Sequence, residues 1–286
     1  MDSIINELLT EVQSSKTKPK DLQQFLYREL LRLTLLLDEG LGGANISGKM
    51  SSLVRKARAA VNGQTDAQRI EQLLDLMYQE WGFCCHYDEY FFSENIFINH
   101  VLYHRRGMPV SLGAVMLYLA SALNLPLYPV NFPTQLIIRA EIRESNGRMV
   151  QKFINPWDGS FITIRDLEKW LEGDMGYGVQ VTRDMLSRAK VEDLSERLEI
   201  VFKMALGREG NYEGMLRIIE HRLDCSPDDP YEIRDRGMVL ASLDCYQAAL
   251  DDFNYFIDQC PEDPASALLK AEVPYLKKKS EEHRLH

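Results

Sequence analysis

Three polar residues, Ser111, Gln135 and Asn155, are the first candidates for chemistry in this sequence, with a hydroxyl that could act as a nucleophile and two amides that could form hydrogen bonds. Ser111 follows Gly107-Met-Pro-Val and precedes a long apolar run, so we expect it near a helix N-terminus, where backbone N–H groups stabilise an anion. Gln135 and Asn155 lie in strand-like segments further along. A serine nucleophile needs a base to accept its proton, and the amides of Gln and Asn do not titrate. Ser111 is therefore a candidate nucleophile, but neither Gln135 nor Asn155 can act as its base.

Other side chains could replace the missing base or bind a metal. His100 and His104 are spaced i, i+4 and would share one face of a helix, but a two-histidine site needs a further ligand. Cys84 and Cys85 precede His86, yet neighbouring side chains diverge and no second ligand pair has zinc-like spacing. We therefore expect no metal site and no cofactor.

Composition predicts a soluble globular protein. The chain has 286 residues, of which 45% are hydrophobic and 27% charged, a size that suggests about two domains. The N-terminus lacks a basic segment leading into an apolar run, and no apolar stretch reaches the ~18 residues that span a membrane. Five cysteines without a CxxC pair favour reduced thiols. We expect a cytoplasmic protein that does not insert into a membrane.

The negative charge is concentrated in one part of the chain. Between Glu192 and Asp263 there are 18 Asp and Glu against 7 Lys and Arg, a net charge of −11, whereas the whole chain carries −10. This asymmetry places a domain boundary near residue 190. It also argues against nucleic-acid binding by the C-terminal part, because phosphate contacts require clustered cations.

The hydrophobic pattern changes from helical to strand-like along the chain. Apolar residues with helical spacing occupy 21–38, 53–61 and 66–81, the last after a capping Thr65. A buried helix is expected from near Val110, followed by strands over 136–143 and 149–154. The intervening Asn146-Gly147 pair is typical of a tight hairpin turn. Helices followed by an antiparallel hairpin indicate an α+β core of the papain-like type.

The C-terminal third contains a helical repeat. With Pro230 as position 1 of a unit of about 34 residues, the small, aromatic and proline positions of a tetratricopeptide repeat are occupied. These residues are Gly237, Ala249, Phe253 and Pro261. A preceding unit is degenerate, because Lys203 occupies its glycine position, and the segment after Pro264 can serve as a capping helix. About three repeats are normally needed for independent stability, so we expect this array to pack against the preceding domain.

Together these features resemble the YchA/SirB family of bacterial proteins over about residues 70–275. The segments that carry the resemblance are 105–113, 132–139, 154–159 and 230–237. It implies a transglutaminase-like domain followed by tetratricopeptide repeats, with Ser111, Gln135 and Asn155 at the three positions of the catalytic triad. The family name also implies a link to gene regulation, and no reaction is firmly attached to the group.

The expected organisation is a helical region over residues 1–65, a transglutaminase-like domain over 66–190, and tetratricopeptide-like repeats with a capping helix over 191–286. The fold class is α+β followed by an all-α part. In such repeats the first helix of each unit lines the concave face, which suits a carboxylate or an extended peptide. The residues expected on this face are Arg197, Met204, Arg208, Tyr231, Arg234 and Met238.

Two functions remain open at this point. The first is a non-catalytic scaffold or adaptor that binds a protein or peptide through its repeats and regulates gene expression indirectly. The alternative is an amidase, peptidase or acyl-transfer enzyme that uses Ser111 with an unrecognised base. The alternative predicts that Ser111→Ala abolishes activity without changing the fold.

Overall fold

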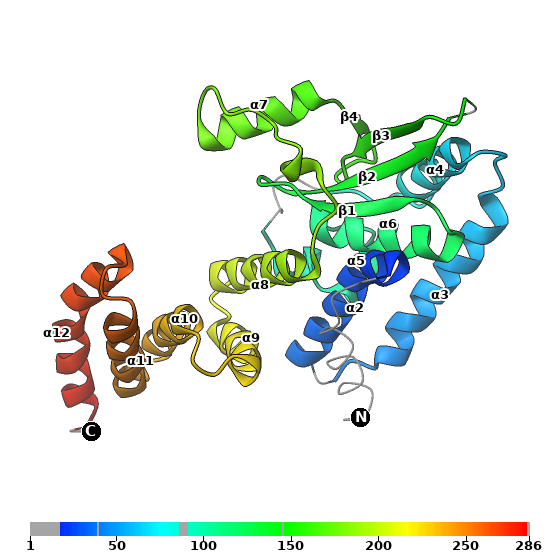
Figure 1. Ribbon diagram of the computed structural model, residues 1–286. Coiled ribbons are helices and arrows are strands. Elements are labelled where there is room, and N and C mark those ends of the chain that lie inside the picture. Colours follow the sequence, from blue (N-terminus) through cyan, green and yellow to red (C-terminus); the bar gives the residue numbers. More distant parts are fainter. Residues whose placement is uncertain (1–17, 39, 86–90, 145, 285–286) are drawn as a thin grey trace. The chain divides into compact units, whose positions relative to one another are not determined.

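The computed structural model describes residues 18–38, 40–85, 91–144 and 146–284 (Figure 1). These residues form two compact units that divide within a helix, between Leu198 and Glu199. The first unit comprises the described parts of 1–32, 42–90 and 94–198, and the second those of 33–41, 91–93 and 199–286. His86, the third residue of the Cys-Cys-His segment, lies outside the described residues.

Helices precede the sheet, as the apolar spacing predicts. They are α2 (Pro19–Leu37), α3 (Gly43–Ala60), α4 (Asp66–Leu74), the π-helix η2 (Asp75–Glu80), the 3₁₀ helix η3 (Ser93–Asn95), α5 (Ile98–His104) and α6 (Pro109–Leu123). Thr65 caps α4 by accepting a hydrogen bond from the backbone N–H of Gln68. The expected single helix over 66–81 is only partly right, because it changes from α to π geometry at Asp75.

Helix α6 is the central element of the first unit. Thirteen of its fifteen residues are buried, and it ends where Asn124 adopts a left-handed conformation with φ 54°. Side chains from the N-terminal helices then bind the carbonyl groups at this end. The Nε2 of Gln23 donates to Leu125 O at 2.7 Å, and Arg69 Nη2 donates to Leu123 O at 2.5 Å. These bonds satisfy acceptors that a helix end leaves open.

The sheet follows α6. In the described residues it has four antiparallel strands in the order β1 (Leu127–Asn131), β2 (Leu136–Arg143), β3 (Met149–Ile154) and β4 (Phe161–Ile162). Strands β2 and β3 form the predicted hairpin, with Arg143 opposite Met149 and Ile138 opposite Ile154. Gly147 in the turn has φ +83°, the conformation that favours glycine.

Helices α6 and α7 lie on opposite faces of the sheet (Figure 1). On one face, Gly113 of α6 lies so close to β2 that a Cβ there would approach the Leu136 side chain to 2.6 Å. On the other face, α7 (Ile164–Met175) contributes Leu167 and Leu171 to a cluster with Val130, Ile137 and Phe153. The loops around the ends of β2 and β3 are therefore held between α6 and α7.

A series of antiparallel helices continues the chain after the 3₁₀ helix η4 (Asp184–Leu186) (Figure 1). They are α8 (Val191–Arg208), α9 (Tyr212–Cys225), α10 (Pro230–Ser242), α11 (Tyr246–Gln259) and α12 (Pro264–Arg284). Gly237 of α10 packs against Phe253 of α11, where a Cβ would lie 2.7 Å from the ring. This close approach explains why the repeat has glycine and an aromatic residue at these positions.

A cluster of charged side chains joins α8 to α10 within the second unit. The Nζ of Lys203 lies 3.0 Å from both carboxylate oxygens of Glu232 and 2.9 Å from Asp235 Oδ2. The three side chains are only 13%, 14% and 25% exposed. Burial lowers the pKa of Lys203, but the hydrogen bonds and charges of Asp235 and Glu232 outweigh it and raise the pKa overall. The lysine at the degenerate glycine position is thus an internal ion-pair partner.

Candidate functional site

Ser111 is the third residue of α6 and is completely buried. Its Oγ donates to the carbonyl oxygen of Asn95 at 2.5 Å and accepts from the backbone N–H of Met108 at 3.1 Å. Gly107 leaves room for this arrangement, because a Cβ there would lie 2.6 Å from the same Oγ. The hydroxyl therefore joins the segment before α6 to the first turn of the helix.

Gln135 and Asn155, the other two predicted site residues, do lie together. The Nε2 of Gln135 donates to Asn155 Oδ1 at 3.0 Å, and the same oxygen accepts from the Trp157 N–H at 3.1 Å. Asn155 begins a turn in which its N–H donates to Ser160 O at 2.8 Å. The side-chain amides thus connect the loop before β2 to the turn after β3.

Glycine and tyrosine fix the shape of this turn. Gly159 has φ +76°, and a Cβ there would come within 2.4 Å of the Tyr78 ring. The Tyr78 hydroxyl donates to Pro156 O at 2.6 Å. Burial, reinforced by Asp158 and Cys85, raises the pKa of Tyr78 well above its ordinary value, so the hydroxyl remains a proton donor.

These contacts limit what Ser111 can do chemically. Its hydrogen bonds lead to backbone atoms, and no His, Asp or Glu side chain among the described residues is hydrogen-bonded to its Oγ. A serine becomes nucleophilic when an adjacent base accepts its proton. In the described geometry, the Ser111 hydroxyl bonds to backbone atoms of Asn95 and Met108.

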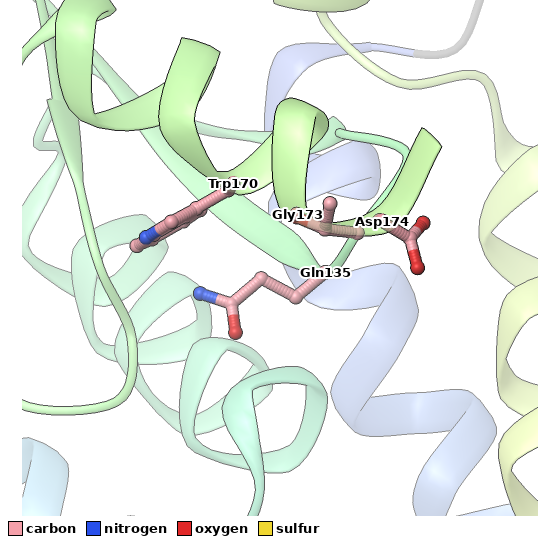
Figure 2. Close-up of a pocket in the computed structure, with 5 residues that line it drawn as sticks. Gln135, Trp170, Gly173 and Asp174 are labelled. Carbon is pink, nitrogen blue, oxygen red and sulfur yellow. The ribbon is translucent and has the colours of Figure 1, made fainter. Parts of the chain in front are cut away.

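Next to Gln135 lies an open cleft with a volume of about 340 Å³. Thr134 and Gln135 line it from the loop before β2, and Trp170, Gly173 and Asp174 line it from α7. Figure 2 shows the Gln135 side chain running beneath α7, with Trp170 toward its amide end and Asp174 toward its backbone end. Of these lining residues only Gln135 is predicted from the sequence; Thr134 and the three residues of α7 are not. The one local feature that could have indicated the α7 side of the cleft is Trp170, a large aromatic residue beside the buried face of an amphipathic helix.

Three of the residues predicted for peptide binding lie together on α10. Tyr231 is 48% exposed and Met238 46% exposed. The Arg234 guanidinium centre lies 5.3 Å from the ring centroids of Tyr231 and Phe256 and donates to Asp235 Oδ1. This set of side chains, Tyr231, Arg234 and Met238, is called the α10 surface below.

Two known protein families match consecutive parts of the chain. The transglutaminase-like superfamily matches residues 44–199, and the tetratricopeptide repeat matches 203–274. A UPF0162 protein of Pasteurella multocida is 48% identical over 259 residues, which cover 90% of this chain and 96% of that protein. The chain belongs to the UPF0162/YchA/SirB1 family. Protein SirB1 of Salmonella typhimurium is 38% identical, covering 87% of this chain and 84% of its own.

YchA of Escherichia coli K12 is 39% identical over 206 residues, covering 72% of this chain and 75% of YchA. No solved structure matches the chain. The predicted family, the α+β class and the order of the two parts are confirmed. The expected limits at residues 65 and 190 stay predictions; the two contact-defined units divide between Leu198 and Glu199.

Arg197 and Arg208, which are also predicted for peptide binding, each contact a residue from an earlier part of the chain. Arg197 donates to the carbonyl oxygen of Phe132 at 2.6 Å and to the side chain of Asn131. It is thus hydrogen-bonded within the first unit, and its role in peptide binding stays a prediction. The guanidinium of Arg208 lies 5.4 Å from the ring centroid of Phe92.

The two histidines that share α5 stack on each other, with ring centroids 5.8 Å apart. Across the described residues, no group of three or more His, Cys, Asp or Glu side chains is placed to hold a metal ion. Nor is any described helix long and apolar enough to cross a membrane.

Replacing Ser111 by alanine tests its structural role. In Ser111→Ala the Asn95 carbonyl and the Met108 N–H each lose one partner but keep their bond to each other at 3.2 Å, so the free energy of unfolding should fall by about 0.5–1.5 kcal/mol. Urea unfolding followed by circular dichroism measures this change. Ser51→Ala, on the exposed side of α3, is the control and should change it by less than about 0.5 kcal/mol. Equal stability of the two variants would contradict the structural role.

Proposed function

We propose that this protein is a non-catalytic adaptor, in which a transglutaminase-like domain serves as a scaffold and the repeats bind a protein or peptide. The observation that carries the proposal is the Ser111 hydroxyl, which is buried and hydrogen-bonded to backbone atoms. At the triad positions that should supply a base and its orienting group, Gln135 and Asn155 bond to each other. None of the three side chains can accept a proton at neutral pH.

Tetratricopeptide repeats generally mediate protein–protein interaction, and the second unit supplies suitable side chains. On α8, Ile200 and Met204 are 47% and 50% exposed, and on α10 Tyr231 and Met238 are similarly exposed. Methionine and tyrosine with arginine favour peptide recognition, because they combine apolar area with hydrogen-bond donors. The acidic charge of this region disfavours nucleic acid as its ligand.

The proposal is tested by placing a charge among the exposed apolar side chains of α8. Met204→Glu should reduce capture of a partner from a reduced cytosolic extract by about tenfold, since a buried charge opposes an apolar contact. Met149→Glu is the matched control, because Met149 is also 50% exposed but lies at the start of β3 in the other unit. The variants are first shown to melt at the same temperature. Quantitative mass spectrometry then gives the amount of partner captured by each variant relative to the wild type.

Equal capture by both variants would contradict the repeat-based adaptor. A partner or covalent adduct that depends on Ser111 would instead favour the amidase or acyl-transfer alternative, for which the hydroxyl must first leave Asn95. As part of the same proposal, the adaptor acts in the cytoplasm and influences gene expression indirectly, through its protein partner. Transcript levels in cells carrying Met204→Glu should then differ from the wild type, whereas those with Met149→Glu should not.

A further inference from the structure

Helix α12 exposes apolar side chains where α9 and α11 expose polar ones. On α9 and α11, exposed residues with the spacing i, i+4, i+7 and i+11 are charged or polar. On α12 the exposed residues with the same spacing are apolar or aromatic, and we call these four the α12 stripe. The residues are Glu213, Arg217, Glu220 and Asp224 on α9, Gln247, Asp251, Asn254 and Asp258 on α11, and Pro264, Leu268, Ala271 and Tyr275 on α12.

The α12 stripe faces away from the core of the second unit. Leu268 is 70% exposed and Tyr275 61% exposed. Their chain neighbours Leu269 and Leu276 are buried in a cluster with side chains of α11. A helix that caps a repeat array normally has a polar outer side, and a contiguous exposed apolar patch marks an interaction site. The α12 stripe therefore has the character of an interface.

The charges at the two ends of α12 indicate what covers the stripe. Immediately before the helix, residues 258–263 contain three acidic residues and no basic one. At the other end, residues 277–284 contain four Lys and Arg and only two Glu. In an antiparallel pair of α12 helices, the acidic end of each copy faces the basic end of the other. A parallel pair would bring like charges together, so the helix is complementary to an antiparallel copy of itself.

An antiparallel copy also continues the packing of this unit. Successive helices of the second unit are antiparallel, with α12 beside α11 (Figure 1). A second α12 related by a two-fold axis would lie in the same way on the side that faces away from α11. Ala267 and Ala271 are exposed between Leu268 and Tyr275. Because the distance between packed helices depends on the side chains at the contact, these small residues let a second helix approach closely.

We propose that the chain forms a symmetric dimer through the α12 stripe, with Lys278 of each copy near Glu262 of the other. Lys278 is 77% exposed and its Nζ lies 3.9 Å from Glu282 Oε1, a contact that leaves it accessible to a second copy. The interface is small, so we expect a Kd of about 10 μM. The proposal does not depend on peptide binding by α8 and α10.

Sedimentation velocity of the full chain between about 1 and 200 μM measures the dimer. Tyr275→Glu should raise the Kd at least about tenfold, because each copy then places a charge in an apolar contact. Tyr103→Glu is the matched control and should leave the Kd unchanged. Tyr103 is also 68% exposed and has a lysine near its ring, as Tyr275 does, but it lies on α5.

Charge reversal tests the antiparallel arrangement. Lys278→Glu and Glu262→Lys should each raise the Kd about fivefold, since like charges then meet at both ends of the interface. The double variant restores opposite charges, so its Kd should return to within about twofold of the wild type. These side chains are exposed, and circular dichroism should show the same melting temperature for all variants.

Three results would overturn the proposal. The first is a wild type that stays monomeric at about 200 μM, which would leave the α12 stripe to a different protein. The second is an equal Kd for Tyr275→Glu and Tyr103→Glu. The third is a double charge-reversal variant that dimerises no better than Lys278→Glu or Glu262→Lys alone.

Discussion

Lys203→Met should lower the free energy of unfolding of the second unit by about 3–5 kcal/mol, the range for removing one partner of a buried ion pair. Without the ammonium, the carboxylates of Glu232 and Asp235 remain mostly buried and unneutralised. Amide hydrogen exchange followed by mass spectrometry measures the loss in peptides from α8 and α10. We expect peptides from the sheet to exchange at nearly the wild-type rate.

A triple variant tests the reason for this loss. Lys203→Met combined with Glu232→Gln and Asp235→Asn removes the unpaired charges, so it should recover most of the lost stability. If the triple variant is as unstable as Lys203→Met, the methylene packing of the lysine, not its charge, supports the contact between α8 and α10.

The second large effect is expected at the turn that presents Asn155 to Gln135. Gly159→Ala should cost about 3 kcal/mol or more, because alanine is strained at φ +76° and its Cβ would displace the Tyr78 ring. Displacing Tyr78 also breaks its hydrogen bond to Pro156 O. Urea unfolding of the wild type and of Gly159→Ala gives the difference in the free energy of unfolding.

Gly147→Ala separates strain from displacement. Gly147 has a similar φ of +83°, but a Cβ there meets nothing within 4 Å. Its replacement should therefore cost only about 1 kcal/mol, the backbone contribution alone. Equal losses for Gly147→Ala and Gly159→Ala would show that the contact with Tyr78 does not determine the turn.

The parts of the fold that follow local rules could be predicted from the sequence. The strands over 136–143 and 149–154 are confirmed with the same bounds, because alternation and an Asn-Gly turn fix a hairpin within a few residues. The buried helix predicted from near Val110 begins at Pro109. The π-helix that begins at Asp75 has no such signal in the sequence. A π-helix has an extra residue in each turn, and the packing around the helix, not its composition, decides where this occurs.

The candidate site was predictable only as far as its positions in the chain. The family resemblance put Gln135 and Asn155 at neighbouring triad positions, and in the structure Gln135 Nε2 lies 3.0 Å from Asn155 Oδ1. The carbonyl that accepts from Ser111 belongs to Asn95, and nothing in the local sequence links the two residues. Likewise, repeat position placed Arg197 on an open face, whereas the carbonyl of Phe132 binds it. In both cases the hydrogen-bonding partner is distant in the chain, so the local sequence could not indicate it.

The carbonyl groups at the end of α6 are bound by side chains from far earlier in the chain. Gln23 and Arg69 bind these groups from α2 and α4, and Gln24 donates to Ser121 at 2.9 Å. A fragment that begins at residue 66 would keep the sheet and its two covering helices, but it would lose the donors of α2 and expose the apolar side chains beneath them. Recombinant forms of the first unit should therefore include α2, because its side chains bind the polar groups at this end of α6.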